Sequence, residues 1–353
     1  MSELPRLLHF NSKNKFDAFV SLFQQFNAWT DVICCQFYHS YMHMQLMNDS
    51  RVALADLVLH KEWFGGAGHY NVPKLTATSS SSKATTTTAV ALCLYLPIKL
   101  WVKVLQYVSK QLTDVTTVVL DNGGSTSSAV AMEINVVHNA MHDCLYVDFM
   151  QRTTTGINRR EYTVPLIAGN EAPEIMMHLP HTFDDSSSEN VNTYTPGNMC
   201  EFRMLASYWC GLLSECASFQ TDVCIQCVNP YSRLCFTSRN SDDTAGADAS
   251  TQGRIKIELD TNDRRVFIDD SFEITVMEIE NDGVEEANDS NICASYTLSV
   301  LYKLCSTPKI STCVSVFVHN KNPIRILYAL GHQSNLNVYC APKIDMDETP
   351  NEN

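Results

Sequence analysis

The sequence predicts an α+β protein made of two similar halves, each with two copies of a helix followed by antiparallel strands. A helical pattern over residues 15–29 places Phe16, Phe19 and Phe23 on one face, and an alternating segment over 31–37 follows it. The same order recurs at 200–219 and 222–228. The Asp-Val pair that opens each alternating segment stands at Asp31 and again at Asp222, a spacing of 191 residues.

Two more helices complete the repeat. The patterns over 97–112 and 294–305 are helical, and strand-like runs over 115–120 and 312–318 follow them. A second run, over 130–137, competes with 115–120 for the place of a single strand. The chain therefore reads as four copies, two in each half.

The domain boundaries follow from composition. Residues 167–198 combine several Gly and Pro residues with an acidic Ser-rich run, which is typical of a linker. We expect an N-terminal domain over 1–166, with a polar insertion at about 65–88 whose low-complexity part is 76–88. A C-terminal domain over 199–345, with a surface loop at 240–253, and an acidic tail over 346–353 complete the chain.

Charge and composition limit the function. The 353 residues carry a net charge of −14, and residues 1–166 hold 13 basic and 12 acidic side chains against 12 and 27 in 167–353. Such a balance argues against a protein that coats nucleic acid through bulk charge. No apolar run is long enough to span a membrane, and the N-terminus lacks a secretory signal, so we expect the 14 cysteines to be mostly buried, reduced thiols.

The basic side chains gather on the expected helices. Lys99, Lys103, Gln106 and Lys110 form one stripe of the helix over 97–112, opposite an apolar side of Leu100, Trp101, Val104, Leu105 and Val108. An ordinary solvated helix face has the same pattern. The other helices add basic residues, and contact with a phosphate backbone without reading of its sequence requires such a layer. The basic set is Lys13, Lys15, Lys99, Lys103, Lys110, Arg203, Lys303 and Lys309, with Arg203 expected on the third helix.

The motifs for metal binding and catalysis are weak. Cys224 and Cys227 lie three apart in an expected strand and point to opposite faces, and no second ligand pair follows at the spacing of a zinc finger. The pairs His39/His43 and His138/His142 fall in expected strands or turns, and the glycines at 65–68 lack the Lys of a phosphate loop. We therefore expect no metal, no cofactor and no catalytic residue.

Two segments carry a family resemblance. Residues 44–59, Met-Gln-Leu-Met-Asn-Asp-Ser-Arg-Val-Ala-Leu-Ala-Asp-Leu-Val-Leu, resemble a hallmark stretch of eukaryotic sliding clamps. Residues 323–331 and 336–344, which end in Ala-Pro-Lys-Ile, resemble the last strands and C-terminal signature of the same proteins. The chain thus resembles the proliferating cell nuclear antigen (PCNA) family. The order of elements fits over nearly the whole chain.

The resemblance implies a ring of three subunits with helices around the hole and sheets outside. It also implies that the ring encircles duplex DNA, is placed there by a clamp loader, and tethers DNA polymerase and other replication and repair enzymes by short hydrophobic and aromatic motifs. The expected location is the nucleus, or a viral replication compartment if a virus encodes the chain. The implied client groove comprises Met47, Arg51, Leu54, Ile175, Met176, Leu179, Pro323, Tyr339, Ala341 and Pro342, and the implied subunit-contact residues are Tyr162, Val164, Ile255 and Ile257.

The departures from the family leave alternatives open. Arg51 stands where the family often has His, the chain is longer than a typical clamp, and the fourth helix is less basic. One alternative is a subunit of a heterotrimeric checkpoint-type clamp, and another is a monomeric viral processivity factor. A metal-dependent nuclease built on the acidic second half is the alternative from a different class.

Overall fold

The computed structural model describes residues 6–72, 90–118, 132–153, 156–169, 199–228, 233–239, 255–260, 273–275, 292–305, 310–319 and 322–343. The chain divides into two compact units. Unit 1 comprises Met1–Asp49, Ala55–Ile175 and Ala329–Leu336, and unit 2 comprises Ser50–Leu54, Met176–Tyr328 and Asn337–Asn353. Their main boundary falls inside the expected linker. The polar run 76–88, the loop 240–253 and the tail 346–353 lie outside the described residues.

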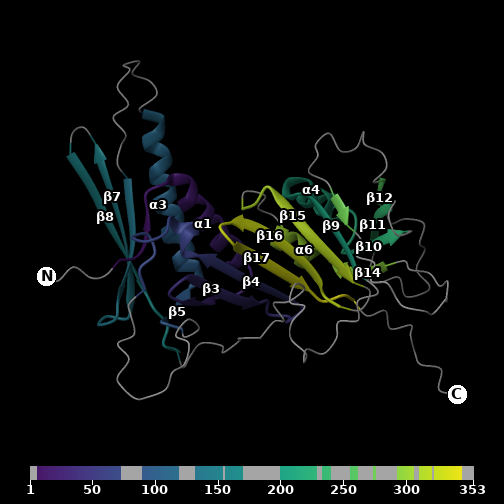
Figure 1. Ribbon diagram of the computed structural model, residues 1–353, viewed down its shortest axis with the longest axis horizontal. Coiled ribbons are helices and arrows are strands. Elements are labelled where there is room, and N and C mark those ends of the chain that lie inside the picture. The colour runs from purple at the N-terminus through teal and green to yellow at the C-terminus, as the bar shows by residue number, and fades with distance from the viewer. Residues whose placement is uncertain are drawn as a thin grey trace. The chain divides into compact units, whose positions relative to one another are not determined.

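Unit 1 holds two copies of one order, a strand, a helix and three strands (Figure 1). The first copy is β1 (Arg6–Phe10), α1 (Lys13–Phe26), β2 (Val32–Phe37), β3 (Tyr41–Met47) and β4 (Ala53–His60), after which comes the short helix α2 (Lys61–Phe64). The second copy is β5 (Leu92–Pro97), α3 (Ile98–Val118), β6 (Met132–Asn139), β7 (Cys144–Thr153) and β8 (Gly156–Pro165).

The two copies exchange their first strands. In unit 1, β1 pairs with β6 of the second copy, and β5 pairs with β2 of the first, all antiparallel. The resulting strand orders are β1-β6-β7-β8 and β4-β3-β2-β5. Because each copy completes the sheet of the other, neither is an independent folding unit.

Unit 2 repeats this plan. Its third copy is β9 (Met199–Leu205), α4 (Ala206–Ala217), β10 (Asp222–Val228), β11 (Arg233–Arg239) and β12 (Lys256–Asp260), followed by β13 (Glu273–Thr275). The fourth is β14 (Ile292–Thr297), α6 (Leu298–Cys305), β15 (Cys313–His319), β16 (Ile324–Gly331) and β17 (Ser334–Cys340). Here too β9 pairs with β15, and β14 pairs with β10. The fold is α+β with antiparallel sheets, which confirms the predicted class.

Aromatic side chains fill both cores. On α1 the Phe16, Phe19 and Phe23 side chains are buried, and the Phe23 ring lies 5.8 Å from that of Trp101 on α3. In unit 2 the buried Trp209 of α4 meets the rings of Phe202 and Phe236 at 6.0 and 6.1 Å. Rings packed edge-on at such distances add attraction to the burial of their area.

One turn shows how local sequence fixes a hairpin. His332 and Gln333, between β16 and β17, both have positive φ, 51° and 62°. Two such residues form a type I′ turn, whose twist matches that of the flanking strands. Gly331 before them has φ 82°, where the absence of a Cβ avoids strain.

The structure corrects the expected element boundaries. Residues 199–205 and 292–297 form strands β9 and β14, so the expected helices over 200–219 and 294–305 begin only at Ala206 and Leu298. Each of these strands runs into its helix without a loop, which leaves no turn residue in the sequence to separate them. The expected strand over 115–120 is wrong for 115–118, because α3 continues to Val118 despite β-branched residues that favour strands. No helix in the described ranges is long and apolar enough to cross a membrane.

Candidate functional site

Helix α3 presents the predicted basic stripe. Lys99, Lys103 and Lys110 are exposed, as is Gln106 between them. The opposite side of the helix, which includes Val104, Leu105 and Val108, is buried. Leu100 is 37% exposed and is the one expected core position that the helix leaves at the surface. The stripe is therefore a continuous cationic surface on a helix that the core holds in place.

Carboxylates lie near both ends of this cationic surface. Asp31 Oδ1 accepts from Lys99 Nζ at 2.6 Å, and this hydrogen bond raises the pKa of Lys99. Asp17 of α1 accepts from Ser109 Oγ of α3 at 2.6 Å and lies 3.9 Å from Lys13. Asp31 thus lies beside Lys99 at the start of the stripe, and Asp17 lies beside Ser109, the neighbour of Lys110.

The helices of unit 2 lack an equivalent stripe. Their exposed side chains include Tyr208 and Glu215 on α4 and Tyr302 and Lys303 on α6. Arg203, expected on the third helix, lies instead in strand β9, exposed and opposite Ser315 of β15. That placement is a correction, because a residue of the sheet does not belong to the helix surface. Lys309 lies outside the described residues.

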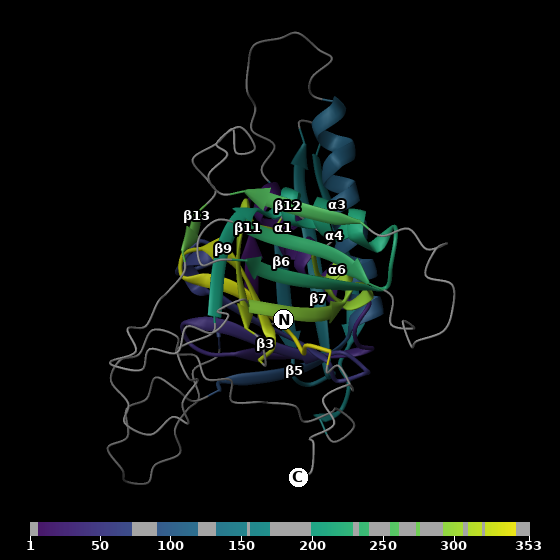
Figure 2. The same cartoon turned by 90° about the vertical axis from the view of Figure 1, so that its right-hand side faces the viewer.

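Strands β8 and β12 are the outer strands of their sheets. In the described part of the chain, β8 pairs only with β7 (Figure 1), and β12 pairs only with β11 (Figure 2). Each strand therefore has a backbone edge available for a further strand. The strand β8 belongs to unit 1 and β12 belongs to unit 2. A head-to-tail contact between copies joins two different surfaces of the chain, and these two edges are such a pair.

The four expected contact residues lie on or beside these strands. On β8, the Tyr162 hydroxyl accepts a hydrogen bond from Gln111 Nε2 at 2.7 Å, while Val164 is fully buried in the core of unit 1. Ile257 of β12 pairs with Phe236, and Ile255 just before β12 exchanges hydrogen bonds with Ser238. The side chains of Ile255 and Ile257 are half-buried, whereas Val164 can contribute only its backbone to an edge contact.

Unit 2 brings together the two halves of the expected client groove. The backbone carbonyl of Val52 accepts from the N–H of Ala341 at 2.8 Å, so the segment around Arg51 lies beside the end of β17. Arg51 has a left-handed φ of 57° and an exposed side chain. Tyr339, Ala341 and Pro342 are half-buried, and Pro323 is exposed.

Two residues of this region differ from the expectation. Leu54 is only 6% exposed and belongs to the core, so it supports the surface from beneath. Val52, which directly precedes β4, is 38% exposed and was missed, because the strand after it is buried at consecutive positions and does not alternate. Met47 is half-buried in unit 1. The linker candidates Ile175, Met176 and Leu179 lie outside the described residues.

An ion pair holds the chain in place directly after Ala341 and Pro342. Lys343 Nζ donates to Asp222 Oδ2 at 2.5 Å, and the Lys343 N–H donates to the carbonyl of Ser295 at 2.8 Å. The Asp222 side chain is 4% exposed, which makes this a nearly buried carboxylate paired with a cation. The Lys of the Ala-Pro-Lys signature therefore has a structural role that the sequence did not reveal.

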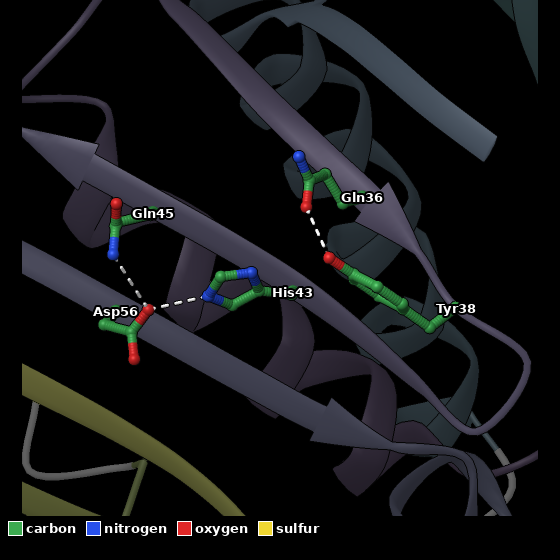
Figure 3. A network of polar contacts seen from close by, with 5 residues as sticks. All are labelled: Gln36, Tyr38, His43, Gln45 and Asp56. Atoms are coloured by element: carbon green, nitrogen blue, oxygen red, sulfur yellow. Dashed lines mark hydrogen bonds and ion pairs between the residues drawn. The ribbon is translucent and has the colours of Figure 1, made fainter. Parts of the chain in front are cut away.

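A polar network on β2, β3 and β4 includes the His43–Asp56 pair (Figure 3). Asp56 is 1% exposed and lies 2.7 Å from His43 Nε2, with Gln45 Nε2 at 3.4 Å. Such a pair resembles part of a hydrolytic triad, but the contacts described for His43 include no hydroxyl or thiol nucleophile. Nor do the described ranges contain a group of three His, Cys, Asp or Glu that could hold a metal.

Comparison with solved structures identifies the fold. The chain resembles the PCNA2–PCNA3 complex from Sulfolobus tokodaii with a TM-score of 0.58 and 15% sequence identity, over 95% of this chain and 98% of that one. The four strand–helix–strand copies therefore form a sliding-clamp fold, and within that class the chain has the PCNA type of fold. No protein-family model matches the sequence, and neither does a curated protein. At this identity the likeness concerns the fold.

Proposed function

We propose that the protein is a non-enzymatic DNA sliding clamp, a ring of three copies that encircles duplex DNA and increases the processivity of a polymerase. The observation that carries the proposal is the exposed stripe of Lys99, Lys103 and Lys110 on a helix of a sliding-clamp fold. The nucleus, or a viral replication compartment, is the proposed location. A clamp loader is the proposed partner that opens the ring.

A closed ring explains how a protein of net charge −14 can act on DNA. Each lysine that meets a phosphate releases counterions and adds affinity, whereas the acidic remainder opposes binding at a distance. A ring stays on DNA by enclosure, so weak phosphate contacts are sufficient. Contacts to phosphate carry no sequence information, and the ring can therefore slide.

The proposed edge contact joins β8 of one copy to β12 of the next. Both strands end their sheets in the described chain, and an added strand satisfies their unpaired backbone groups. Since β8 and β12 belong to different units, each copy presents one edge of each kind. Such a heterologous contact closes into a ring when the rotation that relates one copy to the next is a whole fraction of a full turn.

The surface of Val52, Pro323, Tyr339 and Pro342 is the proposed site for client motifs. These side chains are apolar or aromatic and at least partly exposed. The 2.8 Å hydrogen bond between Val52 and Ala341 joins the segment of Val52 to that of Tyr339 and Pro342. An aromatic anchor beside apolar neighbours is typical of residues that dominate peptide binding. The proposed client is a short hydrophobic and aromatic segment of a polymerase or repair enzyme.

Enclosure of DNA can be tested directly by its dependence on topology. The protein is placed on a nicked circular duplex, with a loader from a related replication system, and the retained protein is measured after gel filtration. We expect retention on the circle and loss after a restriction enzyme linearises it. Equal retention on both forms would contradict enclosure, and Mg²⁺-dependent cleavage of the DNA would favour the nuclease instead.

Client binding has its own test. Tyr339→Ala should weaken the binding of a client peptide with two adjacent aromatic residues by about 2 kcal/mol or more, because Tyr339 is the aromatic member of the surface. Tyr107→Ala is the matched control, since Tyr107 is an exposed tyrosine of α3. Titration calorimetry measures both. Unchanged affinity in a folded Tyr339→Ala protein would exclude this surface.

One observation favours a second candidate, a subunit of a heterotrimeric clamp. The helices of unit 2 carry little positive charge, and in a mixed ring another subunit could supply it. The resembling structure is itself a complex of two different PCNA proteins. A chain that stays monomeric alone and forms a ring only with a different partner would support this candidate.

A further inference from the structure

Two cysteines of the described chain are exposed, Cys93 and Cys293, and each has a second thiol beside it. Cys93 Sγ lies 3.4 Å from Cys34 Sγ, and Cys293 Sγ lies 3.2 Å from Cys224 Sγ. Cysteine is usually among the most buried residues, so an exposed thiol on a strand needs a reason. Eleven other cysteines whose side chains the structure describes are buried or half-buried, and none of these thirteen forms a disulfide.

The two pairs occupy equivalent places in the two units. In unit 1, Cys34 is opposite Tyr95 and Cys93 is opposite Gln36, so the thiols are diagonal neighbours across β2 and β5. In unit 2, Cys224 is opposite Ser295 and Cys293 is opposite Gln226, which is the same diagonal across β10 and β14.

The equivalence extends to the helices that follow. Cys93 and Cys293 each stand four positions before the last residue of their strand, and α3 or α6 begins directly after it. The thiol pair therefore has the same position relative to β5 and α3 in unit 1 as to β14 and α6 in unit 2. The repeat of the whole arrangement shows that the proximity does not depend on one side chain's rotamer in one unit.

We propose that Cys34–Cys93 and Cys224–Cys293 are two equivalent oxidation sites, at which a low-molecular-weight disulfide such as glutathione disulfide converts a thiol pair into a disulfide. A bonded pair of sulfurs is about 2.05 Å apart, so each gap must close by little more than 1 Å. The proposal concerns redox chemistry of the chain and does not depend on DNA binding.

The environment of the unit 1 pair assigns a role to each thiol. The hydrogen bond between the two thiols lowers the pKa of the exposed Cys93 and raises the pKa of the half-buried Cys34. Cys93 is therefore the exposed thiolate that attacks, and Cys34 is the resolving thiol.

The reaction balances in two exchanges. Cys93 Sγ attacks one sulfur of glutathione disulfide, the S–S bond of the reagent breaks, and one glutathione thiolate leaves and takes the proton of Cys34. Cys34 Sγ then attacks Cys93 Sγ, and the second glutathione thiolate leaves and is protonated by solvent. The protein thiols lose two electrons, and the reagent is reduced to two glutathione thiols.

The pairs should differ in rate. Cys34 is half-buried, whereas Cys224 is 2% exposed, and a buried resolving thiol is slower to lose its proton. The Cys34–Cys93 bond should therefore form first. It would tie β5 to β2 immediately before α3, the helix that carries the lysine stripe.

The test uses the full chain with glutathione disulfide as the probe. Free thiols are blocked with N-ethylmaleimide, and trypsin peptides are mapped by mass spectrometry without reduction. Trypsin places Cys93 and Cys293 each on a peptide with no other cysteine, whereas Cys34 shares its peptide with Cys35, and Cys224 shares its peptide with three other cysteines. Fragmentation of the linked peptides therefore locates the partner cysteine. We expect a Cys34–Cys93 crosslink first and a Cys224–Cys293 crosslink later, both reversed by dithiothreitol, with Cys210 of α4 remaining alkylated.

Two variants sharpen the result. Cys34→Ser should abolish the crosslink to Cys93 and leave Cys93 as a glutathione adduct, whereas Cys227→Ser should leave the Cys224–Cys293 crosslink intact. A wild-type protein that keeps a stable adduct at Cys93 without a crosslink, or a crosslink to Cys93 that persists in Cys34→Ser, would overturn the first site. A link from Cys227 to Cys200 in place of Cys224–Cys293 would overturn the second.

Discussion

The helices of the two units differ although their folds repeat. In unit 1, α3 exposes three lysines along one stripe, and in unit 2, α4 and α6 expose tyrosines, a glutamate and one lysine. The strand exchange and the aromatic cores are the same in both units. The fold therefore repeats in unit 2 without the surface charge of unit 1. In the clamp proposed above, unit 1 should supply most of the contact with DNA.

The largest effect should come from the shared part, the aromatic cores. Trp209→Ala removes a fully buried ring between Phe202 and Phe236 and should destabilise unit 2 by about 3–5 kcal/mol. Phe19→Ala is the counterpart in unit 1 and should cost a similar amount. Scanning calorimetry should show each variant lowering a different transition; equal shifts of one transition would mean that the units unfold as a single block.

The next effect compares two ion pairs. Lys343→Ala leaves the nearly buried Asp222 without its cation and should destabilise unit 2 by about 2–3 kcal/mol. Lys99→Ala breaks the exposed pair with Asp31 in unit 1 and should leave the free energy of unfolding nearly unchanged. Urea unfolding measures both. Equal stability of the two variants would show that burial does not distinguish the pairs.

The charge difference itself is tested with DNA. Replacing Lys99, Lys103 and Lys110 with Ala should reduce the slope of log K against log salt by about 2 to 3, if each lysine meets one phosphate. Lys303→Ala in unit 2 should reduce it by about 1 or less. Fluorescence anisotropy over a salt series gives the slopes, and the ring mass serves as the control. Equal reductions per lysine would remove the distinction between the units.

The smallest expected effect concerns pH. Burial lowers the pKa of His319 in unit 2 and of His138 in unit 1, where nearby Asp143 opposes the shift. A lowered pKa means that the folded state resists protonation, so the stability is fully present above the unfolded value of about 6.5 and declines as pH falls below it. His319→Gln and His138→Gln should each flatten the fall in melting temperature between about pH 7 and 5. A fall as steep in both variants as in the wild type would contradict burial as the cause.

The sequence predicted the parts of the fold that have their own periodicity. The Phe16, Phe19 and Phe23 pattern located α1, and the alternation after Asp222 located β10. Strands β9 and β14 were missed because they join their helices without a turn residue. Periodicity alone cannot distinguish such a short apolar strand from the first turns of a buried helix. The exchange of first strands is a long-range pairing that no local pattern encodes.

A candidate surface could be predicted from the sequence where all of its residues lie on one helix or strand. The lysine stripe lies on one helix, so its spacing was sufficient to predict its exposure. Val52 and the Lys343–Asp222 pair depend on segments far apart in the chain and appear only in the folded structure. Arg203 was assigned to a helix because its strand was missed.

The measurement that tests the ring most directly is the mass of the purified protein by light scattering behind a sizing column. A closed ring of three copies has a mass near three times 39.6 kDa, or about 119 kDa. Ile257→Asp, at the edge of β12, should convert that species to one subunit. A wild-type mass of 39.6 kDa at all concentrations and in the presence of DNA would contradict the ring.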